Sequence, residues 1–298
     1  MFKNILQKFK LQNIVGKYIY VNVAVYIFVV LIGVFSVLLN AGDTGKIVVR
    51  YFELPSSLIQ LLHRPWTLFT YMFLHEQFMH LLWNMLALYV FGRIFIDFYS
   101  LRHFVGTYIF GGLLGGIAFV FSYNLFPYFA PYIDNSYLIG ASASVLAIVV
   151  ASAVRNPNYR INLLLVGSVK LSTFALVTVA ISLFMIAGSN AGGNFAHLGG
   201  AAAGWLVAYM LNKGVDVTSI VNKPIDWITT LFKKERFCKK KKTKFKYSSG
   251  NRRADYEYNA RKKTAEAEVD KILEKIKKGG YASLTEDEKK RLFDASSK

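Results

Sequence analysis

Six long apolar segments constrain the fold of this chain more than any other feature of its sequence. A membrane-spanning helix needs about 20 mainly apolar residues to cross a hydrocarbon core of roughly 30 Å, and several segments here approach that length. The predicted spans cover residues 18–39, 78–98, 104–126, 137–154, 171–187 and 195–211. We therefore predict an all-α, polytopic membrane protein whose core is a bundle of six transmembrane helices.

The distribution of basic residues predicts how this bundle is oriented. Lysine and arginine are enriched in cytoplasmic loops. They occur in segment 1–17, beside the second and fourth connections, and throughout the region after the sixth span, whereas the loop at 127–136 contains one charged residue, Asp134. Basic residues in the first loop offset this bias only in part. We expect a multi-pass protein of the cytoplasmic membrane with both termini in the cytosol.

Three fragments associated with these apolar segments carry imidazole, carboxamide and hydroxyl side chains. They are HEQFMHLLWN at 75–84, GASAS at 140–144 and HLGGAAAG at 197–204. Such groups are costly to place in hydrocarbon, and within membrane spans they mark candidate functional sites. Because the second, fourth and sixth spans all start from the outer side, the three fragments should lie together, roughly 5–10 Å below that surface at a rise of about 1.5 Å per residue.

The combination is typical of a serine-nucleophile hydrolase. A serine hydroxyl becomes nucleophilic when a neighbouring imidazole accepts its proton, and Ser142 and His197 form the natural pair. No carboxylate is expected at matching depth, so we predict a dyad and not a triad. Donors for an oxyanion would come from the backbone N–H of Ser142 and from the side chains of His80 and Asn84, which share a helical face at four-residue spacing.

Small residues and one further histidine are expected to support this site. Gly200 and Gly204 form a small-xxx-small stripe on the sixth span, and Gly140 provides a residue without a side chain beside the serine on the fourth. Helices in bilayers approach closely through such residues, as a hydrogen bond between side chains on two helices requires. His75 is expected at the mouth of the second span, where it would help to order the entrance.

The three fragments, taken in order, resemble the motifs of the rhomboid family of intramembrane serine proteases. The matching patterns are H-x4-H-x3-N at His75, His80 and Asn84, G-x-S at Gly140 and Ser142, and H-x2-G-x3-G at His197, Gly200 and Gly204. The resemblance covers about residues 18–211. It implies a six-helix core with the dyad in a water-filled cavity, and cleavage of transmembrane protein substrates near their outer ends, on the extracytoplasmic side.

The chain departs from the family pattern at three places. Ala143 replaces the second glycine of G-x-S-G, one small residue for another. Trp66, which we count among the supporting residues, is followed by Thr67 where a Trp-Arg pair is common, and Arg64 precedes it. Leu146 stands where many relatives carry an aromatic residue that packs on the histidine, which bears on how the imidazole is positioned.

Other functions fit parts of this pattern. A catalytically inactive rhomboid-like protein would bind transmembrane partners, and a transporter would use intramembrane His and Asn side chains as a proton or solute path, although the serine would then be unexplained. The fragment HEQFMH nearly matches the zinc motif HExxH. Its histidines are five residues apart, about 140° around a helix, which excludes that zinc site. With one cysteine in the chain, no zinc cluster can be built from thiols. No metal and no organic cofactor is implied.

The chain beyond the sixth span has a soluble composition. We divide the sequence into a cytosolic amphipathic segment (1–17), the membrane domain (18–212), a basic juxtamembrane linker (213–262) and a small C-terminal helical hairpin (263–298). Basic residues between positions 233 and 246 should attract anionic lipid headgroups, at about 1 kcal/mol each near the surface.

Within the predicted hairpin, apolar residues at helical spacing precede Gly279-Gly280, and Thr285 and Glu288 have the spacing of a capping box. We expect this tail to serve regulation or docking. Nucleic-acid binding is not expected, because the basic run adjoins the membrane and no reader module is recognisable.

Overall fold

A computed structural model describes residues 14–163, 167–188, 190–232, 270–280, 283–289 and 292. The chain divides into two compact units, Met1–Lys233 and Lys234–Lys298. The first unit contains all the predicted spans. Of the predicted amphipathic segment 1–17, the first thirteen residues lie outside the described part of the chain, as does the basic run at 233–246.

The first unit is mainly helical. Six helices correspond in position to the predicted spans: α2 (Ile14–Leu38), α6 (Phe78–Phe98), α7 (Leu101–Leu125), α8 (Ser142–Arg155), α9 (Leu171–Phe184) and α10 (Ala191–Asn212). Short elements fill the connections: α3 (Thr44–Arg50), β1 (Leu54–Pro55), α4 (Leu58–His63), α5 (Thr67–Thr70), η1 (Tyr71–Phe73), η2 (Pro127–Tyr132), β2 (Tyr137–Leu138), β3 (Arg160–Leu163) and β4 (Gly167–Lys170). A further helix, α11 (Ser219–Phe232), follows α10.

Three of these helices, α2, α6 and α7, are long and apolar enough to cross a membrane. Helices α8 and α9 are apolar but have 14 residues each, about 21 Å at 1.5 Å per residue. Helix α10 has 22 residues, many of them small. The helices therefore support a membrane protein, while six complete crossings remain a prediction.

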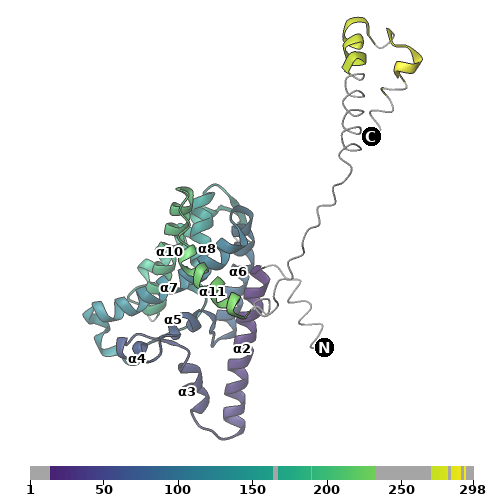
Figure 1. Ribbon diagram of the computed structural model, residues 1–298. Coiled ribbons are helices and arrows are strands. Elements are labelled where there is room, and N and C mark those ends of the chain that lie inside the picture. The colour runs from purple at the N-terminus through teal and green to yellow at the C-terminus, as the bar shows by residue number, and fades with distance from the viewer. Residues whose placement is uncertain are drawn as a thin grey trace. The chain divides into compact units, whose positions relative to one another are not determined.

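The core of the first unit lies where α7, α8 and α10 pack together (Figure 1). Residues 143–153 of α8 are all buried. The contacts are close because glycines face α8 from both sides: a Cβ added at Gly111 of α7 would overlap the Ala147 side chain, and one at Gly204 of α10 would overlap the Ala147 carbonyl oxygen. In α2, by contrast, the buried residues are Val15 and Asn22, which suits a helix surrounded by lipid.

The fourth predicted span starts too early. We expected it to begin at residue 137, but α8 begins at Ser142. The preceding strand β2 pairs antiparallel with β1, with Leu54 opposite Leu138. The N–H of Ser56 donates to the carbonyl oxygen of Ser136 (3.0 Å) and extends the pairing. A contact between segments far apart in the sequence therefore sets the start of this helix.

Helix α11 was not foreseen, since residues 213–262 were predicted to form a linker. It packs on α7: Asn222 Nδ2 donates to the Arg102 carbonyl oxygen (3.1 Å), and Arg102 forms an ion pair with Asp226 (2.5 Å). Gly106 of α7 accommodates the side chain of Thr218, which lies where a Cβ would be. The compact membrane unit therefore continues through α11.

In the second unit, the structure describes a helix over residues 270–279, which ends at Gly280 with a positive φ of 74°. The expected capping-box contact is present: the N–H of Thr285 donates to Glu288 Oε2 (2.8 Å), and the N–H of Glu288 donates to Thr285 Oγ1 (3.4 Å). Lys275 forms an ion pair with Glu288 (2.9 Å). Residues 263–269, 281–282, 290–291 and 293–298 of the predicted hairpin lie outside the described part of the chain.

Candidate active site

Ser142 is the first residue of α8, and the chain before it makes a tight turn. Gly140 has a φ of 113°, which residues with a side chain rarely adopt, and its N–H donates to the carbonyl oxygen of Tyr71 (3.0 Å). This turn carries the chain from β2 into α8. Backbone N–H groups in the first turn of a helix lack intrahelical acceptors, so the N–H of Ser142 can serve a bound ligand.

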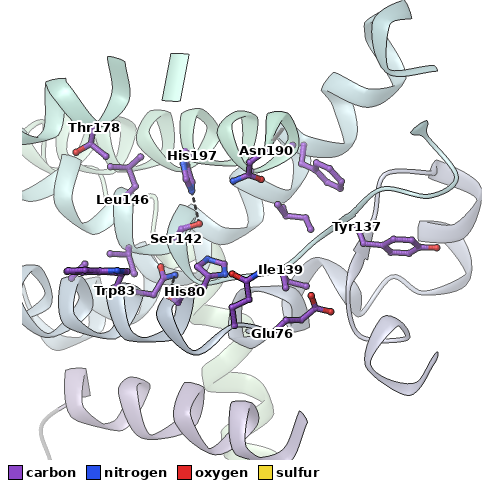
Figure 2. A pocket seen from close by; sticks show the side chains of 18 of the residues that line it. Glu76, His80, Trp83, Tyr137, Ile139, Ser142, Leu146, Thr178, Asn190 and His197 are labelled. Carbon is purple, nitrogen blue, oxygen red and sulfur yellow. Dashed lines mark hydrogen bonds between the residues drawn. The ribbon is translucent and has the colours of Figure 1, made fainter. Parts of the chain in front are cut away.

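His197 lies in the second turn of α10 and reaches this serine. Its Nε2 is 2.8 Å from Ser142 Oγ, and Figure 2 shows the two side chains pointing toward each other. The approach depends on Gly200, because a Cβ there would overlap the carbonyl oxygen of Ala143 on α8. The predicted close contact between the two helices therefore exists, and it brings imidazole and hydroxyl within hydrogen-bond distance.

His80 and Asn84 extend from α6 toward the same place. A Cβ on Gly140 would lie 2.7 Å from His80 Cε1, so the ring packs against the turn that precedes the serine. Asn84 is 7% exposed, and its amide donates one hydrogen to the His80 carbonyl oxygen (2.9 Å). A carboxamide has two N–H groups. The second one remains for a ligand in the cavity that both residues line.

A cavity of about 1000 Å³ joins these residues, a size typical of ligand sites. Other polar residues that line it include Glu76, Gln77, Asn135, Ser136 and Asn190, and apolar ones include Phe91, Val145, Leu146, Val149 and Phe174. In Figure 2, Glu76 and Tyr137 lie on one side of the Ser142–His197 pair, and Leu146 and Thr178 lie on the other. The Ser142–His197 pair thus lies between these two groups of lining residues.

His75, expected at the mouth of the second span, lies three residues before α6 and is buried against the turn that precedes Ser142. It has no exposed surface, and its Nε2 accepts from the N–H of Ala141 (3.5 Å). Its ring is 5.1 Å from that of His80. Burial and, to a smaller extent, the neighbouring His80 lower the pKa of His75 to about 4, so the imidazole is neutral and able to accept this hydrogen bond.

Trp66, predicted as a supporting residue, and Ser144, the second serine of the GASAS fragment, both lie away from the Ser142–His197 pair. Trp66 is absent from the cavity lining; its Nε1 donates to the Tyr51 carbonyl oxygen (3.1 Å) and so ties together the first loop. Ser144 is fully buried on another face of α8, with its Oγ 4.0 Å from Met72 Sδ. It therefore does not compete with Ser142 for His197.

Sequence reasoning missed Ser182 of α9. Its Oγ lies 3.2 Å from Nδ1 of His197, the ring nitrogen that faces away from Ser142. A serine in an apolar helix usually indicates only packing, but there was a signal. Thr178 and Ser182 are four residues apart, and therefore put two hydroxyls on one face of an otherwise apolar span.

Among the described residues, no three His, Cys, Asp or Glu side chains cluster as metal ligands would. The residues that the structure does bring together offer a hydroxyl, two imidazoles, a carboxamide and a backbone N–H.

Comparison with known proteins assigns two parts of the chain. The family model for the rhomboid domain matches residues 62–214, about half of the chain, and this range includes every cavity residue named above. A family of unknown function, DUF6576, matches residues 253–298. No curated protein matches the chain.

Proposed function

The chain belongs to the rhomboid family, whose members are intramembrane proteases or inactive relatives of them, and from this premise we propose that it is an active serine endopeptidase that cleaves transmembrane proteins. The observation that carries the proposal is the distance of 2.8 Å between Ser142 Oγ and His197 Nε2. An inactive relative has no need of a hydroxyl and an imidazole in contact beside a cavity.

In the proposed reaction, Ser142 Oγ attacks the carbonyl carbon of the scissile peptide bond while its proton passes to Nε2 of His197. The resulting imidazolium then gives this proton to the leaving amine, and the C–N bond breaks to leave an acyl-enzyme. A water molecule attacks the ester after losing a proton to His197, which returns that proton to Ser142 Oγ as the acid product leaves.

Negative charge develops on the carbonyl oxygen in both steps. We assign its stabilisation to the N–H of Ser142, the second amide hydrogen of Asn84 and the ring of His80. Such donors act strongly because they are already held in place and need no reorganisation when the charge develops. His75 and Gly140 support these donors indirectly. His75 accepts a hydrogen bond from the N–H of Ala141, and the missing side chain of Gly140 leaves space for the His80 ring.

The location of the reaction follows from the charge distribution. We infer that both termini lie in the cytosol and that the cavity opens to the extracytoplasmic side of the cytoplasmic membrane, because lysine and arginine concentrate in the connections assigned to the cytosol. Substrates would be membrane proteins whose spans become extended near that surface, since a hydrogen-bonded helix does not expose its carbonyl carbons to a nucleophile.

Proteolysis by the full-length chain in proteoliposomes tests the proposal. A panel of single-span reporter proteins with small residues near the outer end of the span would be incubated with the wild type, Ser142→Ala, His197→Ala and the matched control Ser144→Ala. We expect fragments with one defined new terminus from the wild type and Ser144→Ala alone. Fragments of the same mass from purified Ser142→Ala would refute the assignment of Ser142 as the nucleophile. A panel left intact by a folded wild type would favour a partner-binding relative.

A further inference from the structure

Ser182 contacts the side of the His197 ring that the proposed reaction leaves unassigned. It lies on α9 and is 3% exposed. Its Oγ is 3.2 Å from His197 Nδ1 and 3.1 Å from the carbonyl oxygen of Thr178, one turn earlier on the same helix. The three groups thus form a chain of hydrogen bonds that continues through His197 Nε2 to Ser142 Oγ.

The two contacts of Ser182 Oγ together set the direction of the bonds. For both to be hydrogen bonds at once, the single hydroxyl hydrogen of Ser182 must point to the Thr178 carbonyl, which can only accept, and Ser182 Oγ must accept from His197. Nδ1 therefore carries the hydrogen, and Nε2 of the neutral ring is left with its lone pair toward Ser142. This is the tautomer that a general base requires.

We propose that Ser182 is a positioning residue that fixes the tautomer and orientation of His197, a task that a carboxylate performs in serine triads. The inference rests on the proposed function. Of the described residues that line the cavity, Glu76 is the one carboxylate. Figure 2 shows it on the side of Ser142 opposite His197. A neutral hydroxyl on α9 thus takes the orienting role.

A second contact holds α9 in the required place. Asn194 lies one turn before His197 on α10, is buried, and donates through Nδ2 to the carbonyl oxygen of Met185 at the end of α9 (2.7 Å). The end of α9 that carries Ser182 is therefore tied to the start of α10 that carries the imidazole. A bond from Nδ1 strengthens when the ring becomes charged, so Ser182 should contribute more to the transition state than to the resting enzyme.

The test is the rate at which a fluorophosphonate inactivates the full-length protein in detergent, separated into the maximal rate constant kinact and the half-saturating concentration KI. The variants are Ser182→Ala, Ser182→Thr, Ser182→Cys and the control Ser152→Ala. Ser152 is a matched residue because it is fully buried and its Oγ donates to a carbonyl four residues earlier, Ile148 (2.8 Å), yet it lies ten positions from the nucleophile on α8.

We expect Ser182→Ala to lower kinact about three- to tenfold, the range for loss of one hydrogen bond, with KI unchanged. Ser182→Thr, which keeps the hydroxyl, should restore most of the rate. Ser182→Cys, a weaker acceptor that fits the same space, should fall between serine and alanine, and Ser152→Ala should match the wild type.

Two results would overturn the inference. Equal kinact for Ser182→Ala and the wild type would show that the hydroxyl does not position the base. Equal loss in the Ala, Thr and Cys variants, or in Ser152→Ala, would assign the effect to packing. Failure of the proposed function itself is recognised separately, because the wild type would then be inert before any variant is compared, and the inference would fall with it.

Discussion

At the scale of single residues, the candidate site depends on a glycine without a side chain as much as on the residues proposed to react. Gly140 has no side chain at a φ of 113°, and the space a Cβ would fill is taken by the His80 ring at 2.7 Å. The imidazole and the turn before Ser142 therefore determine each other's positions. Asn84 then completes the set of donors from the same face of α6.

The role of Asn84 can be measured directly. Replacement by alanine removes one oxyanion donor, for which losses of about a hundredfold in kcat are typical; because His80 and the Ser142 N–H remain, we expect Asn84→Ala to lose less than Ser142→Ala. Reporter cleavage rates give the comparison. Asn22→Ala is the control, since Asn22 also donates to a carbonyl four residues earlier, Tyr18 (2.9 Å), but lies on α2. Equal losses in both variants would contradict an oxyanion role.

We expect Glu53 to make the stability of the protein depend on pH. Burial, followed by the neighbouring Glu76, raises the pKa of Glu53 to about 7, although Arg50 and Arg64 act in the opposite direction. In the unfolded chain the glutamate loses its proton above its ordinary pKa of about 4.3, whereas in the folded chain it keeps the proton up to about pH 7. The contribution of Glu53 to the free energy of unfolding is therefore complete below about pH 4.3 and is lost as the pH rises through about 7.

We therefore predict that the wild type loses thermal stability between pH 5 and pH 8 more steeply than Glu53→Gln, which is neutral throughout. At pH 8 the variant should have the higher Tm, because it avoids a carboxylate in a buried position. Thermal unfolding of the two proteins in one detergent at both pH values provides the measurement. Parallel decreases in Tm would show that Glu53 is not the group responsible.

At the scale of elements, the site exists because α10 lies directly on α8. Gly200 permits this contact, since an added Cβ would overlap the backbone of Ala143. We predict that Gly200→Ala forces the helices apart, destabilises the protein by about 1–3 kcal/mol and, through a misplaced imidazole, slows fluorophosphonate labelling on the order of a hundredfold.

Gly33→Ala is the matched control for this prediction. It makes the same change within α2, where nothing lies within 4 Å of the new Cβ, so both labelling and Tm should equal those of the wild type. If Gly200→Ala labels as fast as Gly33→Ala, the close approach of α8 and α10 is not what aligns the reactive pair.

Elements also show where sequence reasoning succeeds and where it stops. Hydropathy located α2, α6, α7, α9 and α10 to within a few residues. The polar residues predicted at one depth led us to expect contact between Ser142 and His197, and the two side chains are 2.8 Å apart. The start of α8 was missed because it depends on the pairing of Leu54 with Leu138, which no local pattern reveals. Ser182 and α11 were missed for a related reason, since each is defined by a contact with another helix. Ser182 contacts His197 on α10, and α11 packs on α7.

At the scale of the whole molecule, the chain joins a rhomboid unit to a C-terminal unit of a different family. The sequence between the two family matches contains nine basic residues and one glutamate at positions 233–246. We propose that this segment binds anionic headgroups, because polybasic segments beside membrane helices gain about 1 kcal/mol per basic residue at such surfaces.

The single cysteine of the chain, Cys238, lies inside this segment and can report on it. We predict that an environment-sensitive dye on Cys238 shifts to the blue in nanodiscs with anionic lipid relative to zwitterionic ones, and that 1 M salt reverses the shift because screening is then strong beyond about 3 Å. Replacing the four lysines at 239–242 by glutamine should remove most of the shift. An equal shift in both lipids would exclude charge recognition.

The most direct test of the central claim is to identify the atom that a fluorophosphonate modifies in the purified protein. The wild type, Ser142→Ala, Ser144→Ala and His197→Ala would be labelled in detergent and the adduct located by peptide mass spectrometry. We expect one adduct, on Ser142, that persists in Ser144→Ala and is lost in Ser142→Ala and His197→Ala. Labelling that survives in His197→Ala, or that maps to another serine, would contradict a nucleophile activated by His197.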